Sequence, residues 1–210
     1  MENSAKNGIE LLGAKTGNCI RAAIALEEVS ATYSVRKIRL HSGEHKTAGY
    51  LDLNPSGQVP TLIDHNQGEQ PLVLAQSNAI IFYAAEMQPD TILPVSDPRE
   101  RARALERFFF FITDVVVPSN TAFLLERFGD AAGAAVLYQR SIAALAVAET
   151  YLGQHPYMAG DRFTVADIPA VTIISSMSSN IDWSQHSLLN RWYEQLMARP
   201  SVTAGMHAFD

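Results

Sequence analysis

The stretch that decides the fold is Asn54-Pro55-Ser56-Gly57-Gln58-Val59-Pro60-Thr61-Leu62-Ile63. Proline presets φ and glycine tolerates positive φ, so Pro-Ser-Gly predicts a tight turn. A short apolar strand then begins at Thr61. Proline suits a strand start because it cannot donate a ladder hydrogen bond, and an X-Pro bond can be cis at modest cost. Either Pro60 simply initiates this strand, or a cis bond turns the peptide groups of Val59 outward to pair with an extended peptide ligand.

The residues on both sides of this stretch predict alternating strands and helices up to about residue 88. The order β-α-β-α-β-β-α predicts a mixed sheet covered by helices. The first two strands should be parallel because a helix connects them, and the hairpin adds antiparallel partners. The predicted elements are a strand over 9–12, a buried helix from about Cys19 to Val29, a strand from Tyr33 to about Leu40, a short helix within 41–53, strands over Thr61–Asp64 and Leu72–Ala75, and a helix over Ser77–Met87.

After residue 88 the sequence predicts helices only. The stretch 88–96 contains two prolines and no periodicity, which is typical of a linker. Asp97-Pro98-Arg99-Glu100 supplies an N-cap, a first-turn proline and an acidic N3 residue. The predicted helices are a long one from 98 through Phe108–Phe111 that bends at Pro118, one over about Ala131–Tyr151, one that starts at the Thr164–Asp167 capping box with a Phe163/Ile168 staple, and one over about Ser187–Ala198. We therefore expect a domain over 1–88, a linker over 89–97 and an all-helical domain over 98–210.

Composition narrows the class of protein. A hydrophobic content of 47%, a charged content of 18% and a net charge of −6 indicate a folded protein without a nucleic-acid surface. No apolar run approaches the roughly 20 residues that span a bilayer. The first four residues lack the features of an export signal, and Cys19 is the single cysteine. These features predict a cytoplasmic protein without an intramolecular disulfide.

Three loop or strand ends should meet at one corner of the predicted sheet. They are Thr16-Gly17-Asn18 at the start of the first helix, Val59-Pro60 at the strand entrance, and Gln76-Ser77 after the hairpin. Ser77 is predicted to be a helix N-cap, where free N–H groups and the positive dipole end favour a carboxylate or phosphate. The Gln76 amide can hydrogen-bond an α-amino acid group, since it both donates and accepts. Alternatively, Ser77 only caps its own helix.

Thr16 and Asn18 suit the stabilisation of a thiolate. A free thiol has a pKa of about 8.5, so a bound thiol is mostly protonated at neutral pH. Hydrogen bonds from the Thr16 hydroxyl, the Asn18 amide and the helix-start N–H groups favour the charged form. Neither side chain is a general base, so each can only donate to the anion. The alternative is a Thr/Asn pair that merely caps the helix.

Four further features have both a functional and a structural interpretation. Cys19 is either a nucleophile activated by the same helix end or a small residue packed in a buried helix. His45 either helps to bind a ligand carboxylate or is a solvated loop histidine, and together with His41 it lacks the third ligand of a metal site. Arg127 either reaches a ligand carboxylate or lies on the surface. Phe108–Phe111 form core, a subunit interface or the wall of an apolar pocket.

Four motifs, each weak alone, form a highly specific combination. They are Asn54–Leu62 with its Val-Pro, Gln76–Ile80, Gly160–Asp167, and the tail from Trp192 to Val202. In these motifs the chain resembles the glutathione S-transferase family over essentially its whole length. The resemblance implies a thioredoxin-like α/β N-terminal domain followed by an all-helical C-terminal domain, usually in a homodimer. It also implies that Val59 pairs through its backbone with the cysteinyl part of glutathione, that Pro60 is cis, and that Gln76 and Ser77 hold the γ-glutamyl end.

The stretch before the first helix suggests a class within that family. Residues 13–18 contain no tyrosine and look like the bacterial nu-class pattern, in which a Thr and an Asn two residues on hold the thiol. The resemblance implies a cytoplasmic detoxifying transferase without a metal, with glutathione as co-substrate. From their residue types, His45 and Arg127 are further candidate contacts to a ligand carboxylate. The thiolate would attack a small hydrophobic electrophile, a peroxide or a disulfide. A catalytically weak glutathione-binding module and a Cys19-dependent thiol transferase remain open as alternatives.

Overall fold

The computed structural model describes residues 8–68 and 70–210 of the chain. The prediction about an export signal concerns residues 1–4 and so lies outside the described residues. By their contacts, the described residues form two units, the first ending at Gln88 but also including Pro200–Asp210, and the second spanning Pro89–Arg199.

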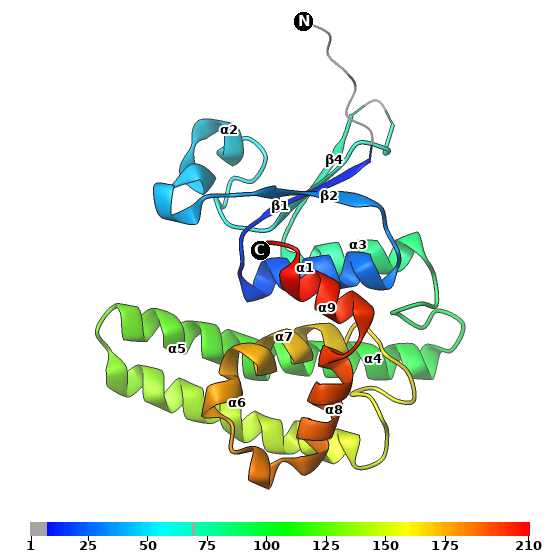
Figure 1. Ribbon diagram of the computed structural model, residues 1–210, viewed down its shortest axis with the longest axis vertical. Helices are drawn as coiled ribbons and strands as arrows, with labels where there is room; N and C mark the ends of the chain where they lie inside the picture. Colours follow the sequence, from blue (N-terminus) through cyan, green and yellow to red (C-terminus); the bar gives the residue numbers. More distant parts are fainter. Residues whose placement is uncertain (1–7, 69) are drawn as a thin grey trace, which may run out of the picture. The chain divides into compact units, whose positions relative to one another are not determined.

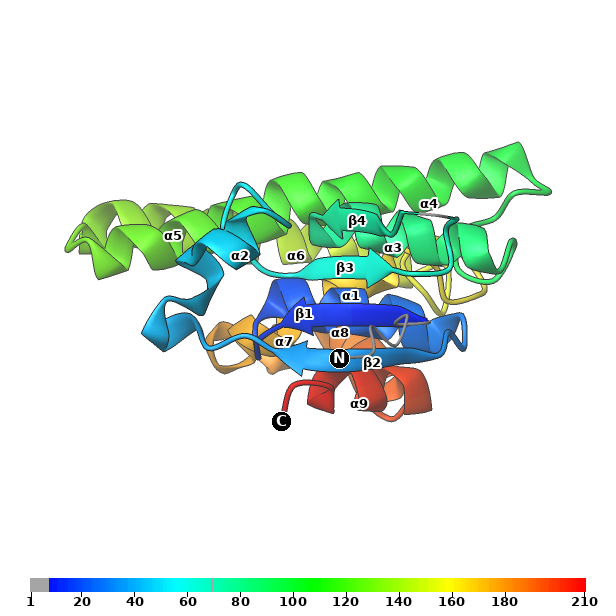
Figure 2. The same ribbon diagram turned by 90° about the horizontal axis from the view of Figure 1, so that it is seen from above.

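The first unit contains one mixed sheet. Its strands lie in the order β2-β1-β3-β4, with β1 and β2 parallel and the other pairs antiparallel, as the sequence predicts (Figure 2). The strands are β1 (Ile9–Gly13), β2 (Tyr33–Lys37), β3 (Thr61–Asp64) and β4 (Leu72–Ala75), and the helices are α1 (Gly17–Glu28), α2 (Ala48–Leu51), α3 (Ser77–Met87) and α9 (Pro200–His207).

Each face of this sheet is covered by helices because both faces carry apolar side chains. Leu11 and Leu62 lie opposite each other on one face, and both are fully buried. Leu12 and Ile63 belong to a second cluster that includes Tyr50 of α2. In Figure 1, α1, α3 and α9 lie on one side of the sheet and α2 on the other. Side chains of neighbouring strand residues alternate between faces, which explains the two clusters.

The last helix, α9, is absent from the predicted elements, since the last predicted helix ends before Pro200. α9 packs on α1 within the first unit. A Cβ atom at Gly205 would lie 2.5 Å from Cγ1 of Ile24, so only glycine permits this close approach. The prediction places all of 98–210 in the helical domain, whereas the contacts place 200–210 with the sheet.

The second unit is helical, and no residue in it forms a named strand. Asp97 caps its first helix by accepting hydrogen bonds from the N–H groups of Arg99 (2.7 Å) and Glu100 (3.4 Å), as predicted. The main helices are α4 (Pro98–Phe110), α5 (Val117–Arg127), α6 (Ala131–Leu152), α7 (Asp167–Met177) and α8 (Ser187–Met197).

The junction of α4 and α5 differs from the predicted bend at Pro118. A π-helical turn over Phe111–Val116 joins the two helices, and Pro118 lies in the first turn of the helix that follows it. Pro118 has no N–H for the carbonyl four residues earlier, so the regular ladder is interrupted there in any case. Phe108 and Phe111 are fully buried whereas Phe109 is half exposed, so the aromatic run serves both core and surface.

The predicted capping box at the start of α7 forms only in part, because the N-cap of the helix is Ala166, which makes no side-chain cap hydrogen bond. Thr164 donates its backbone N–H to the Asp167 carboxylate at 2.9 Å. The same carboxylate accepts hydrogen bonds from the Met158 N–H at 3.1 Å and from Nε1 of Trp192 at 2.9 Å. Burial raises the pKa of Asp167 to about 6, although these hydrogen bonds oppose the shift. Asp167 is thus a buried polar centre that joins three segments of the second unit.

Two helical stretches of the described chain, Pro98–Arg127 and Ala131–Leu152, are long and apolar enough to cross a membrane by length and composition. This differs from the prediction that no apolar run approaches the length of a membrane span. Core helices of a soluble protein pass the same test, so this observation is weak evidence for a membrane location.

Candidate active site

Strand register brings the three predicted segments to the same end of the sheet. Leu12 of β1 pairs with Thr61 of β3, and Thr61 pairs with Ala75 of β4. The loop that leaves β1, the Val59-Pro60 entrance to β3 and the Gln76-Ser77 exit from β4 therefore lie side by side. This corner lies entirely within the first unit.

The loop after β1 ends at Thr16, which caps α1. Its backbone is extended, and its hydroxyl accepts a hydrogen bond from the Cys19 N–H at 3.4 Å. The same hydroxyl donates to Sγ of Cys19 at 3.1 Å. Asn18, in contrast, is half-buried, and its amide has no hydrogen-bond partner among the described residues. Of the two predicted thiolate donors, Asn18 is the one whose side chain is free.

Cys19 lies inside the first unit. Its side chain is fully buried, and its sulfur accepts a hydrogen bond from the Ala14 N–H at 3.4 Å. Burial raises the pKa of the thiol, and the hydrogen bonds from Thr16 and Ala14 offset this only in part. A buried thiol with a raised pKa remains protonated at neutral pH, and this does not favour Cys19 as a nucleophile.

A buried arginine adds positive charge to the start of α1. Arg21 is 3% exposed, and its Nη2 atom lies 4.0 Å from the place of a Cβ at Gly17. Burial lowers the pKa of its guanidinium to about 10, so it keeps its charge at neutral pH. Its Nε atom is buried without a hydrogen-bond partner in the described part of the chain. Arg21 and the helix dipole therefore both favour an anion at this corner.

The Val59-Pro60 peptide bond is cis, as the resemblance implies. Two buried side chains hold the turn before it. The carbonyl of Gln58 accepts hydrogen bonds from the Tyr50 hydroxyl at 2.7 Å and from Nδ2 of Asn54 at 2.8 Å. The backbone N–H and C=O of Val59 have no hydrogen-bond partner within 8–68 and 70–210. They are therefore free to pair with a ligand backbone.

The exit from β4 corrects one prediction. Gln76, not Ser77, is the N-cap of α3, and Gln76 has a positive φ of 83°. Ser77 is the first residue of the helix and is buried. The chain already turns at Gln76, so the helix begins one residue earlier than the preference of serine for caps predicts. The N–H groups of Ser77, Asn78 and Ala79 have no partner among the described residues and mark an anion-binding helix end.

The two remaining predicted residues lie in different units. His45 belongs to the short helix Glu44–Lys46, and its Nδ1 atom is buried without a partner in the described chain. The neighbouring Lys46 donates to the Gly57 carbonyl at 2.7 Å, which joins this segment to the turn before Val59. Arg127 ends α5, and its guanidinium lies 5.8 Å from the ring centroid of Phe123. No group of three or more His, Cys, Asp or Glu that could hold a metal occurs among the described residues.

Sequence reasoning missed Tyr50, Arg21 and the supporting role of Asn54. A charged residue inside the otherwise apolar first helix was a usable signal for Arg21, because a buried arginine has a large desolvation cost. The roles of Tyr50 and Asn54 depend on a shared contact with Gln58 that no spacing rule predicts.

The fold and the corner together define a thioredoxin-like protein with an appended helical unit. Two family profiles match the sequence, "Glutathione S-transferase, N-terminal domain" over residues 10–86 and "Glutathione S-transferase, C-terminal domain" over residues 122–200. Together they cover well over half of the chain. The chain therefore belongs to the glutathione S-transferase family, which confirms the resemblance at the level of the family.

Individual relatives agree with this assignment. The disulfide-bond oxidoreductase YfcG of Escherichia coli (strain K12) is 26% identical over 210 residues, which cover 92% of each chain. The glutathione S-transferase GstB of the same strain is 28% identical over 194 residues, covering 88% of this chain and 90% of its own. A crystal structure of a glutathione transferase homolog from Lodderomyces elongisporus, with two GSH per subunit, is 27% identical with a TM-score of 0.85, covering 96% of this chain and 99% of that one.

Proposed function

We propose that this chain is an enzyme that binds glutathione at the corner of its sheet and activates the thiol for attack on an electrophile, a peroxide or a disulfide. The observation that carries the proposal is that three segments with unpaired hydrogen-bonding groups meet at one end of the sheet. A tripeptide with carboxylates, an amine and a thiol needs such a set of donors and acceptors. The names of the relatives, a disulfide-bond oxidoreductase and a glutathione S-transferase, support the same reactions.

In this proposal each segment holds a different part of glutathione. The free backbone groups of Val59, next to Pro60, pair with the cysteinyl residue in the manner of an added strand. The Gln76 amide and the N–H groups that begin with Ser77 hold the γ-glutamyl end. His45, which belongs to the same unit, is the proposed contact to the remaining carboxylate.

The proposed activation relies on hydrogen bonds and charge rather than on a general base. The Asn18 amide and the N–H groups at the start of α1 donate to the sulfur, and the positive charge of Arg21 stabilises the same anion. Thr16 acts in one of two ways. Its hydroxyl either rotates away from Cys19 and donates to the glutathione sulfur, or it stays in place as the N-cap of α1 and so orients Asn18. This Thr/Asn arrangement also supports membership of the nu class, which stays a prediction.

Substitution of Asn18 tests the proposal directly. We expect Asn18→Ala to lower kcat by about tenfold or more with little change in KM for glutathione, because the amide contact matters most once the thiolate forms. Steady-state kinetics with an aromatic electrophile, a hydroperoxide and a small disulfide would measure this. Asn66→Ala, in the loop at the other end of β3, is the matched control. Equal losses in kcat and affinity would contradict the proposed role.

The alternatives of the sequence analysis give different outcomes in the same assays. Cys19→Ser should leave most of the activity, whereas a Cys19-dependent thiol transferase would lose all of it. Glutathione binding without turnover on any of the three substrates would instead identify a catalytically weak binding module. The binding module remains a second candidate because the Thr16 hydroxyl donates to Cys19 and so is not directed at a ligand.

We further propose that the protein is a cytoplasmic homodimer. Apolar side chains of the second unit are half exposed or more, namely Phe109, Val117, Phe123, Leu124, Phe128 and Val136. Association would remove this surface from water. Light scattering coupled to gel filtration should give the mass of a dimer, and Phe123→Glu with Phe128→Glu should shift it to the monomer. A monomeric wild-type protein would contradict the proposal.

A further inference from the structure

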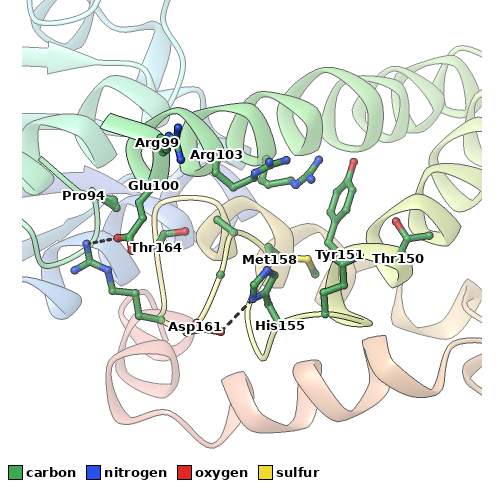
Figure 3. Close-up of a pocket in the computed structure, with 15 residues that line it drawn as sticks. Pro94, Arg99, Glu100, Arg103, Thr150, Tyr151, His155, Met158, Asp161 and Thr164 are labelled. Carbon is green, nitrogen blue, oxygen red and sulfur yellow. Dashed lines mark hydrogen bonds and ion pairs between the residues drawn. The ribbon is translucent and has the colours of Figure 1, made fainter. Parts of the chain in front are cut away.

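A cavity lies within the helical unit, far along the sequence from the corner described above. Its volume is about 610 Å³, within the range of small-molecule sites. It is lined by α4, by the end of α6 and by the loop that leads to α7 (Figure 3). Every lining residue belongs to the second unit.

The lining is unusually rich in arginine. Arg99, Arg103 and Arg107 follow one another at intervals of four residues, so they share one face of α4. Figure 3 shows Arg99 and Arg103 on the wall that faces Tyr151 and His155. A fourth arginine, Arg162, comes from the loop. In a chain of net charge −6, this is a local concentration of positive charge.

The carboxylates near the cavity are already paired. Glu100 forms an ion pair with Arg162, with 3.4 Å between Oε2 and Nη2, and the Asp161 carboxylate lies 3.1 Å from Nδ1 of His155. Glu106 pairs with both Arg103 (3.0 Å) and Arg107 (3.1 Å), but it does not line the cavity. Four lining arginines thus face two lining carboxylates. Asp90, which does not line the cavity, lies 3.7 Å from Arg162, so among the described residues Arg99 is the lining arginine without an ion-pair partner and is the most open to an anion.

Two of these arginines are available to a ligand in different ways. Arg107 is largely buried and lies over the Tyr151 ring, 3.4 Å from its centroid, so its plane is fixed. Its Nε atom is buried without a hydrogen-bond partner among the described residues. Arg99 has no ion-pair partner within 8–68 and 70–210. A planar guanidinium in a fixed position recognises carboxylate or phosphate oxygens in pairs.

We propose that this cavity is a second ligand site, which binds a small molecule with two or more anionic groups, either phosphates or carboxylates. Arg99 and Arg103 supply the exposed charge, and Arg107 supplies an ordered donor beside Tyr151. Pro94 and Met158 give the cavity apolar walls, so the ligand can carry an uncharged part as well. This proposal does not depend on the function of the glutathione corner.

Calorimetric titration of the full chain with pyrophosphate and with citrate tests the proposal. The titration is done with saturating glutathione and in a chloride buffer, so that the added anions do not bind at the glutathione corner. We expect at least one anion to bind below about 1 mM, more weakly as salt is added. Pyrophosphate alone would indicate a phosphate ligand, and citrate alone a polycarboxylate. Binding of neither up to about 5 mM would overturn the proposal.

Two charge-removing variants separate a built site from general surface charge. Arg99→Gln with Arg103→Gln should weaken binding by about tenfold or more, since both charges would be lost from the cavity. Arg140→Gln is the matched control, because Arg140 is exposed, does not line the cavity and is 3.9 Å from its partner Asp114. Thermal unfolding checks that each variant is folded. An equal effect of the control would also overturn the proposal.

Discussion

Asn54 connects the turn that precedes the active corner to the strand that follows it. It is 2% exposed, and Nδ2 donates to the Gln58 carbonyl at 2.8 Å and to Oγ1 of Thr61 at 3.3 Å. On the other side, Oδ1 accepts hydrogen bonds from the N–H and hydroxyl of Ser56. A single side chain therefore fixes the backbone on both sides of Val59.

Asn54→Ala should therefore damage both stability and ligand binding. We expect the free energy of unfolding to fall by about 1–3 kcal/mol, because buried partners of Asn54 would lose their hydrogen bonds. KM for glutathione should rise more than kcat falls, since Val59 positions the ligand rather than the reacting sulfur. Denaturant unfolding and steady-state kinetics measure the two effects. Unchanged KM with reduced stability would limit Asn54 to a structural role.

The residue types at the corner were predictable, but their hydrogen bonds were not. Thr16 is recognisable as a helix cap from its place before an apolar run. The direction of its hydroxyl depends on the position of Cys19 inside the fold, which the sequence does not contain. The same holds for Gln76, whose positive φ follows from the path of the chain between β4 and α3.

At the scale of elements, the buried Asp167 organises the start of α7. Removal of its carboxylate would leave the N–H groups of Met158, Thr164 and Trp192 without acceptors. Asp167→Ala should therefore lower the free energy of unfolding by about 2–4 kcal/mol. Asp52→Ala, at an exposed position, should change it little. Similar effects of the two substitutions would show that the carboxylate is not a structural centre.

The pH dependence of stability gives a separate test of Asp167. Its folded-state pKa of about 6 lies above the usual value near 3.9, so the folded state binds the proton more tightly between about pH 4 and 6. The contribution of this group to the free energy of unfolding must then fall as pH rises through that window and stay constant above it. Asp167→Asn should remove this pH dependence, which amounts to a total change of up to about 3 kcal/mol in the free energy of unfolding across the window. Parallel pH profiles of the two proteins would contradict the shift.

Strong local signals explain which elements were predictable. The hairpin strands Thr61–Asp64 and Leu72–Ala75 have clear turn residues between them, and their bounds were predicted as found. α9 was missed because a sequence with valine, threonine and glycine has low helix propensity, and its packing on α1 outweighs that preference. The π-helical turn Phe111–Val116 was missed because apolar periodicity does not distinguish an α-helical from a π-helical turn.

At the scale of the whole chain, the last residues return to the first helix. Phe209 is 6% exposed, and a Cβ at Gly13 would lie 2.8 Å from both its ring and the Cys19 sulfur. Asp210 pairs with Lys15 at 2.5 Å and with His207 at 2.6 Å, and these contacts lower the pKa of its carboxyl to about 2. The loop that carries Thr16 thus packs against Phe209 and Asp210.

Phe209→Ala should loosen this contact. We expect a loss of about 3 kcal/mol in the free energy of unfolding and faster alkylation of Cys19 under native conditions. Phe128→Ala is the control, since Phe128 is 84% exposed. Denaturant unfolding and the rate of reaction with N-ethylmaleimide provide the two readouts. A Cys19 that stays equally protected in both variants would rule out this role for Phe209.

The π-helical turn Phe111–Val116 indicates where related sequences can lose a residue without a change of fold. Such a turn closes its hydrogen bonds over one more residue than an α-helical turn does. Deleting one residue there would convert it to α-helical geometry and leave the downstream helix facing the same way. The same deletion in the middle of α6 would swing its core-facing side chains toward water, so natural gaps should be tolerated at this junction first.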